Sequence, residues 1–138
     1  MSHTSNLSGP QLRVMRTQLG RVRGLGAAKA GTAHWWAQRL TAVALLPLTL
    51  WFLYAALHLV GAPRAAVAHW AGNPINAALL VALVVVTYRH LWLGLQVVIE
   101  DYVHSEWLKL STLVAMRLIS IALAVAGIFA VLRLAFGG

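Results

Sequence analysis

Two polar residues, Arg89 and His90, interrupt one of the most apolar stretches of the sequence. The stretch, residues 74–99, otherwise has the length and composition of a membrane-spanning helix. Counted along such a helix, His90 lies about 24 Å from Pro74 and about 15 Å from Glu100, which places it inside the hydrocarbon. A charged side chain at that depth costs roughly 2.5–3.5 kcal/mol or more, so it is expected to face a partner or a cavity.

A neutral imidazole is cheaper to bury than a charge, and it can serve as an axial ligand to haem iron. The alternative is that His90 only forms a hydrogen bond to a neighbouring helix. Haem in an electron-transfer protein usually takes two axial ligands, and no other histidine of the chain lies at a matching depth. The others lie at the ends of apolar runs or in the N-terminal tail: His3, His34, His58, His69 and His104. If haem is bound, its second ligand is therefore expected from another chain.

The helical phase of the residues after His90 adds to this interpretation. Gly94 lies one turn further along, and Asp101 lies only about 20° away in angle from His90. The glycine leaves room beside the imidazole for a flat ring, and the same face reaches Asp101 and Tyr102 at the membrane boundary. This arrangement suits a redox cofactor beside a hydrophobic substrate.

The composition shows which kind of protein carries these residues. Of the 138 residues, 60% are hydrophobic and only 10% are charged, whereas soluble domains have roughly 45–50% apolar and about 25% charged residues. The sequence therefore predicts an integral membrane protein, with no room within these residues for a separate catalytic domain. It contains no cysteine, which excludes iron–sulfur clusters and thiolate zinc sites held by this chain alone.

Three apolar runs predict an all-α membrane protein with three transmembrane helices. Pro47 lies inside the first run and is expected to bend it. Two short connections separate the runs, at 61–73 and 100–107. The predicted spans cover about residues 40–60, 74–99 and 108–132.

The distribution of charge predicts the orientation. The formal net charge is +8, and the basic residues concentrate before the first run, where Lys and Arg favour the cytoplasmic side and attract anionic lipid headgroups. We therefore expect a basic cytoplasmic tail over residues 1–30 and a three-helix membrane domain over 31–138. The tail has no aromatic residue, so nucleic-acid binding is not expected. Six of the eleven basic residues lie in this part of the sequence: Arg13, Arg16, Arg21, Arg23, Lys29 and, at the first run, Arg39.

Two motifs carry a resemblance to a known family. The segment HLWLGLQVVIEDY, His90 to Tyr102, resembles the H-x3-G-x6-DY signature of the succinate dehydrogenase hydrophobic membrane anchor subunit. The segment GTAHWWAQRLTA, Gly31 to Ala42, resembles the G-x7-R-x-T-A segment that leads into the first span of that family. The length and the three-span plan also match, so the resemblance covers about residues 24–136.

The resemblance implies a role for four residues. His90 would be the axial ligand to haem b, whose other histidine comes from a companion anchor subunit. Tyr102 would donate a hydrogen bond to a carbonyl oxygen of ubiquinone, and Asp101 would shape that site or assist proton uptake. Arg39 would approach a haem propionate from the cytoplasmic side. One departure concerns His34, which stands three residues after the upstream glycine, where the family often has a histidine two residues after it.

The resemblance further implies a membrane anchor of succinate:ubiquinone oxidoreductase (respiratory complex II) in a bacterial inner membrane. The chain would pack with a second three-helix cytochrome b anchor chain, and it would bind a flavoprotein subunit and an iron–sulfur subunit. The basic tail and the acidic connection at 100–107 would face the iron–sulfur subunit. Electrons from succinate would reach ubiquinone at the inner membrane edge, and the isolated chain would have no catalytic activity.

Several alternatives remain open at this point. A fumarate reductase anchor differs in direction and in the type of quinone, and a non-redox assembly or transport subunit would need neither cofactor. A transporter would need an acidic residue or a broken helix at the midplane, whereas all three acids lie near one boundary: Glu100, Asp101 and Glu106. Each site residue also has a structural interpretation: Tyr102 as an interfacial aromatic, Asp101 as a helix-end residue, and Arg39 and Arg117 as snorkelling side chains.

Overall fold

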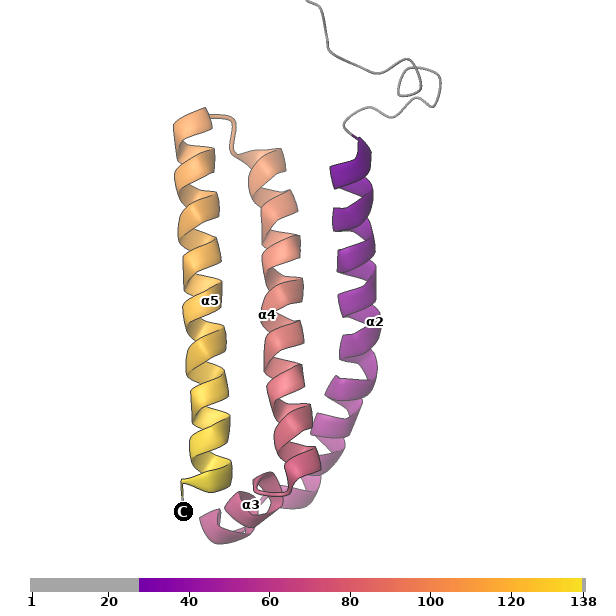
Figure 1. Ribbon diagram of the computed structural model, residues 1–138, viewed down its shortest axis with the longest axis vertical. Helices are drawn as coiled ribbons and strands as arrows, with labels where there is room; N and C mark the ends of the chain where they lie inside the picture. The colour runs from indigo at the N-terminus through magenta and orange to yellow at the C-terminus, as the bar shows by residue number, and fades with distance from the viewer. Residues whose placement is uncertain (1–27, 138) are drawn as a thin grey trace, which may run out of the picture. The chain divides into compact units, whose positions relative to one another are not determined.

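The computed structural model describes residues 28–137, and all regular secondary structure over these residues is α-helix, joined by short connections. The predicted basic tail, residues 1–30, lies outside the described residues except for its last three. Residues from Ala33 onward form one compact unit, and the contacts given below lie within it. The described helices are α2 (Ala28–Leu59), α3 (Arg64–Ala71), α4 (Pro74–Tyr102) and α5 (Glu106–Phe136) (Figure 1).

Three of these helices are long and apolar enough to cross a membrane, over Gly31–Leu59, Pro74–Tyr102 and Glu106–Phe136. This confirms the prediction of three spans. The 29 residues of α4 extend about 44 Å, which matches a bilayer with its headgroups. Large apolar side chains cover the outer surface: Leu57 is 73% exposed and Val60 is 79% exposed. Such a surface is stable only where lipid or another protein covers it.

The connection between the first two spans is more ordered than the sequence predicted, because it contains the short helix α3. The chain leaves α2 through Gly61, whose φ of +78° is a left-handed conformation that favours glycine. Asn73 then caps α4 by accepting a hydrogen bond from the backbone N–H of Ile75 at 2.9 Å, and Pro74 occupies the first helical turn.

Helix α3 is held against its neighbours by close packing at its C-terminal end. A Cβ atom at Gly72 would lie 2.9 Å from the carbonyl oxygen of Ala135 in α5, so only glycine allows this approach. Trp70 of α3 stacks on Trp51 of α2 with ring centroids 5.7 Å apart. Figure 1 shows α2 bending in its second half toward α3, which agrees with the bend expected from Pro47 inside this helix.

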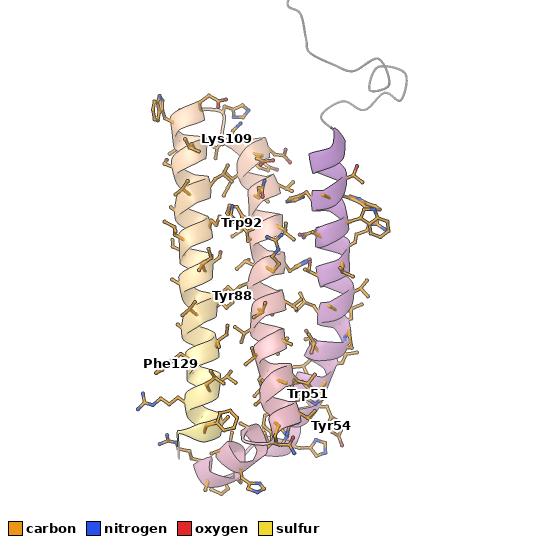
Figure 2. The ribbon with its side chains drawn as sticks, in the orientation of Figure 1. Trp51, Tyr54, Tyr88, Trp92, Lys109 and Phe129 are labelled. Carbon is orange, nitrogen blue, oxygen red and sulfur yellow. The ribbon has the colours of Figure 1, made fainter. Side chains whose placement is uncertain are left out.

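Helices α4 and α5 run antiparallel beside each other (Figure 1). A Cβ atom at Gly127 of α5 would lie 3.0 Å from a methyl group of Val84 of α4. The small residue thus allows the two backbones to approach closely, as at many helix contacts in membranes. Figure 2 shows Tyr88 and Trp92 on the side of α4 that faces α5.

We predict that Gly127→Val destabilises the protein by about 1–3 kcal/mol, because the new methyl groups overlap with the stiff side chain of Val84. The double variant Val84→Ala/Gly127→Val exchanges the volumes and should recover most of the loss. Thermal unfolding of the purified protein in detergent measures both. A Gly127→Val protein as stable as the wild type would contradict the close α4–α5 contact.

Candidate functional site

His90 lies near the middle of α4, is half-buried, and faces α2. Its Nδ1 atom is 2.9 Å from the hydroxyl oxygen of Thr41. Its Nε2 atom is 3.4 Å from the amide nitrogen of Gln38. Both imidazole nitrogens are therefore in contact with polar side chains of one neighbouring helix.

The polar side chains on α2 form a stripe, which we call the α2 polar stripe and define as His34, Gln38 and Thr41. Their spacing of four and then three residues places them on one face of the helix. Sequence reasoning assigned no role to Gln38 or Thr41. The signal that could have found them is this helical spacing of polar residues at the start of an otherwise apolar run.

Two atoms of the α2 polar stripe have unmet hydrogen-bonding capacity. Among the described residues, the buried side-chain atoms without a hydrogen-bond partner are His34 Nε2 and Gln38 Oε1. A buried polar atom without a partner is costly. The stripe is therefore suited to a polar or charged group that comes from outside this chain.

Gly94, one turn after His90, bears on whether a flat ring can lie beside the imidazole. A Cβ atom at Gly94 would meet the Gln38 amide nitrogen at 3.6 Å and nothing else within 4 Å. The space beside the glycine is thus bounded by the end of a flexible side chain, which can rotate away. With the unpartnered atoms of the stripe, this arrangement fits a haem whose iron is bound by His90 Nε2.

The histidines of the described residues do not gather around His90. Within residues 28–137 there is no cluster of three or more His, Cys, Asp or Glu side chains that could hold a metal ion. His90 is the one histidine of this range that lies near the middle of a spanning helix.

Asp101 and Tyr102 are in the last turn of α4, and both are exposed. They lie about 17–18 Å along the helix axis from His90, so the structure does not bring them into contact with it. Tyr102 is 79% exposed, which leaves its hydroxyl free to meet a ligand or a partner. Asp101 shares the helix face of His90 by its spacing.

Arg39 is exposed and lies outside the α2 polar stripe. Its guanidinium carbon is 4.3 Å from the ring centroid of Trp35, one turn earlier, in a cation–π contact. The structure thus places Arg39 beside Trp35 and does not bring it to His90.

A separate pocket of about 220 Å³ lies between α4 and α5. Arg89 and Arg117 both line it, and the Arg117 guanidinium carbon is 5.8 Å from the ring centroid of Trp92. Arg117, for which the sequence suggested snorkelling, therefore also has an aromatic neighbour within the chain. Arg89 and His90 are adjacent in sequence, but they face different neighbours: Arg89 faces α5 and His90 faces α2.

The fold and the site define a class of protein: a multi-pass membrane subunit whose buried polar residues lie between its spanning helices. Comparison with known proteins identifies the family. Residues 13–132 match the family model described as "Succinate dehydrogenase/Fumarate reductase transmembrane subunit". The chain belongs to this family, whose members are subunits of an oxidoreductase complex.

Individual relatives agree with the family match. The chain is 36% identical to the succinate dehydrogenase hydrophobic membrane anchor subunit of Rickettsia bellii, over 84% of this chain and 93% of the relative. It is 31% identical to the succinate dehydrogenase membrane anchor subunit of Reclinomonas americana, over 67% of this chain and 80% of the relative. It is 29% identical to the hydrophobic membrane anchor subunit of Paracoccus denitrificans, over 84% and 89% of the two chains.

No solved structure matches the chain significantly. The three spanning helices and the bacterial relatives identify the chain as a multi-pass protein of the bacterial inner membrane.

Proposed function

We propose that the chain is the hydrophobic membrane anchor of a succinate:ubiquinone oxidoreductase, respiratory complex II. In this proposal His90 provides one axial ligand of haem b, and the end of α4 at Asp101 and Tyr102 forms part of the ubiquinone site. The observation that carries the proposal is the half-buried imidazole of His90, which contacts the α2 polar stripe from α4. It lies near the middle of a spanning helix, where lipid alone would favour an apolar residue.

When bound, haem b supplies a one-electron redox centre inside the membrane. The residues of this chain bind and orient it. His90 Nε2 would hold the haem, and the Gln38 side chain would have to turn out of the space next to Gly94. The buried, unpartnered atom of His34 would be available to a polar group of the haem.

Arg39 is proposed to pair with a haem propionate. Helices α2 and α4 are antiparallel, and Thr41 lies opposite His90, so residues before Thr41 lie toward the same end as Tyr102. A guanidinium there can leave the Trp35 ring and form a charge-assisted hydrogen bond with a carboxylate. We place this end in the cytoplasm, because the basic residues of the tail precede α2.

Ubiquinone reduction takes up two electrons, which the partner subunits would supply, and two protons; the residues at the exposed end of α4 can bind the quinone and deliver a proton. The Tyr102 hydroxyl can donate a hydrogen bond to a quinone carbonyl oxygen, which polarises it toward reduction. The Asp101 carboxylate, exposed beside it, can take a proton from water and pass it on.

The proposed partners follow from the family to which the chain belongs. A flavoprotein subunit oxidises succinate, an iron–sulfur subunit carries the electrons to the membrane, and a second cytochrome b anchor supplies the other histidine. The exposed apolar side chains of α2 and α4 are suited to pack against that second anchor.

A fumarate reductase anchor is a second candidate, because the matching family model covers both enzymes. The two differ in the direction of electron flow and in the quinone. A transporter is disfavoured by the positions of the acids, which lie at the end of α4 and the start of α5 and not at mid-depth.

We expect affinity purification of the tagged chain from its native membrane to recover a flavoprotein, an iron–sulfur protein and a second membrane chain with three spans. Mass spectrometry and flavin fluorescence identify them. Purification of the chain with transport proteins only, and without flavin, would contradict the proposed complex.

We expect His90→Ala to remove or strongly shift the b-type haem absorption of the purified complex, because one axial ligand is lost. The haem-to-flavin ratio and the Soret and α bands provide the measurement. His58→Ala is the matched control, since this exposed histidine contacts only its own helix, at the Tyr54 carbonyl. An unchanged haem spectrum in His90→Ala would refute the assignment of the ligand.

For the quinone site, Tyr102→Phe should lower ubiquinone reduction roughly fivefold, since one hydrogen bond contributes about 1 kcal/mol. Succinate oxidation with an artificial acceptor should stay at the wild-type rate, because it does not use the quinone site. Tyr54→Phe, which changes an exposed tyrosine in the second half of α2, is the control. An equal loss of both activities would argue against a quinone role.

A further inference from the structure

We infer that Thr41 is a positioning residue that holds His90 in the tautomer with its hydrogen on Nδ1, and so leaves the Nε2 lone pair free for the iron. The inference rests on the proposed role of His90 and extends it to a residue on another helix. It depends on the direction of each hydrogen bond around the imidazole.

The single hydroxyl hydrogen of Thr41 has two acceptors in the backbone of its own helix. Thr41 Oγ1 donates to the carbonyl oxygen of Ala37 at 2.8 Å, and the carbonyl oxygen of Gln38 is 3.0 Å away. Both carbonyl oxygens can only accept. With that hydrogen directed to a carbonyl oxygen, the hydroxyl oxygen meets His90 with a lone pair, and across the 2.9 Å contact Nδ1 would carry the hydrogen and donate it.

The contact at the other imidazole nitrogen leads to the same tautomer independently. The amide nitrogen of Gln38 can only donate, and it lies 3.4 Å from His90 Nε2. A donor on that side requires a lone pair on Nε2. The contact is longer than a usual hydrogen bond, so an incoming metal can displace the amide at little cost.

The position of the Thr41 hydroxyl is itself well defined. A threonine in a helix is restricted to few χ1 rotamers, and the bond to the carbonyl four residues earlier selects one of them. Because Thr41 belongs to α2 and His90 to α4, this hydroxyl also fixes the direction of the imidazole plane relative to both helices. Second-shell acceptors of this kind orient a histidine ligand and raise its basicity.

A more basic ligand stabilises ferric over ferrous iron, so Thr41 is expected to lower the haem midpoint potential. Replacing it with Val keeps the shape and removes the acceptor. We predict that Thr41→Val raises the midpoint potential of the haem bound by His90. A tenfold loss in the preference for ferric iron corresponds to about 59 mV for a one-electron couple. Thr41→Ser keeps the hydroxyl and should restore the wild-type value.

The test uses the complete complex in detergent, with redox titration of the α band and the low-spin ferric EPR signal as readouts. Thr49→Val is the matched control, because Thr49 is on the same helix and is exposed. Thr41→Ala also removes the acceptor, and it provides the measurement if the Val variant fails to assemble. A rise in potential with Val or Ala, rescued by Ser and absent in Thr49→Val, supports the inference.

Two outcomes would overturn it, and they are distinguishable from each other. If His90→Ala alters the haem but Thr41→Val and Thr41→Ala only reduce stability, with potential and EPR signal unchanged, Thr41 is a structural contact between helices. If the wild-type complex contains no b-type haem, or His90→Ala leaves it unchanged, the proposed function fails at His90 and the inference fails with it.

Discussion

The hydrogen bond between Thr41 and His90 is the contact on which the arrangement of the site depends. It joins α2 to α4 at mid-depth, at 2.9 Å, where lipid offers no competing water. Without it, the half-buried imidazole would keep only the 3.4 Å contact of its Nε2 atom with the Gln38 amide. The same threonine also forms a hydrogen bond to the backbone of α2. The backbone of α2 therefore fixes the position of the imidazole through Thr41.

Helix α4 separates two environments that are built by different means. On the α2 side, polar side chains contact each other, and two of their buried atoms, in His34 and Gln38, have no hydrogen-bond partner. On the α5 side, steric fit dominates, with Gly127 allowing the close approach of Val84. Arg117 is accommodated there by the ring of Trp92, whose face attracts a cation. The well-packed α4–α5 pair can therefore serve as the rigid support for a more open site between α4 and α2.

The sequence predicts the three spans well, because length and hydropathy alone determine which segments can cross a bilayer. It does not predict α3, because the eight residues Arg64–Ala71 look like part of a connection. Contacts with Trp51 and with α5 stabilise them as a helix. Similarly, His90 stands out because it interrupts an apolar run, whereas Gln38 and Thr41 are polar residues at the start of a run. Their roles depend on which face of α2 meets α4, and only the tertiary structure defines that face.

The tautomer of His90 also bears on how the site would assemble. A lone histidine in an apolar environment could place its hydrogen on either nitrogen, and a ligand in the wrong tautomer would have to exchange a proton where water is scarce. In the inferred arrangement, Thr41 and Gln38 would select the useful tautomer within one chain, before any partner arrives. The conformational entropy of orienting His90 is then lost when this chain folds. Association with a second anchor has only to supply the other ligand. Binding of a cofactor between two chains is easier when each chain orients its own ligand, because neither chain alone has to complete the coordination.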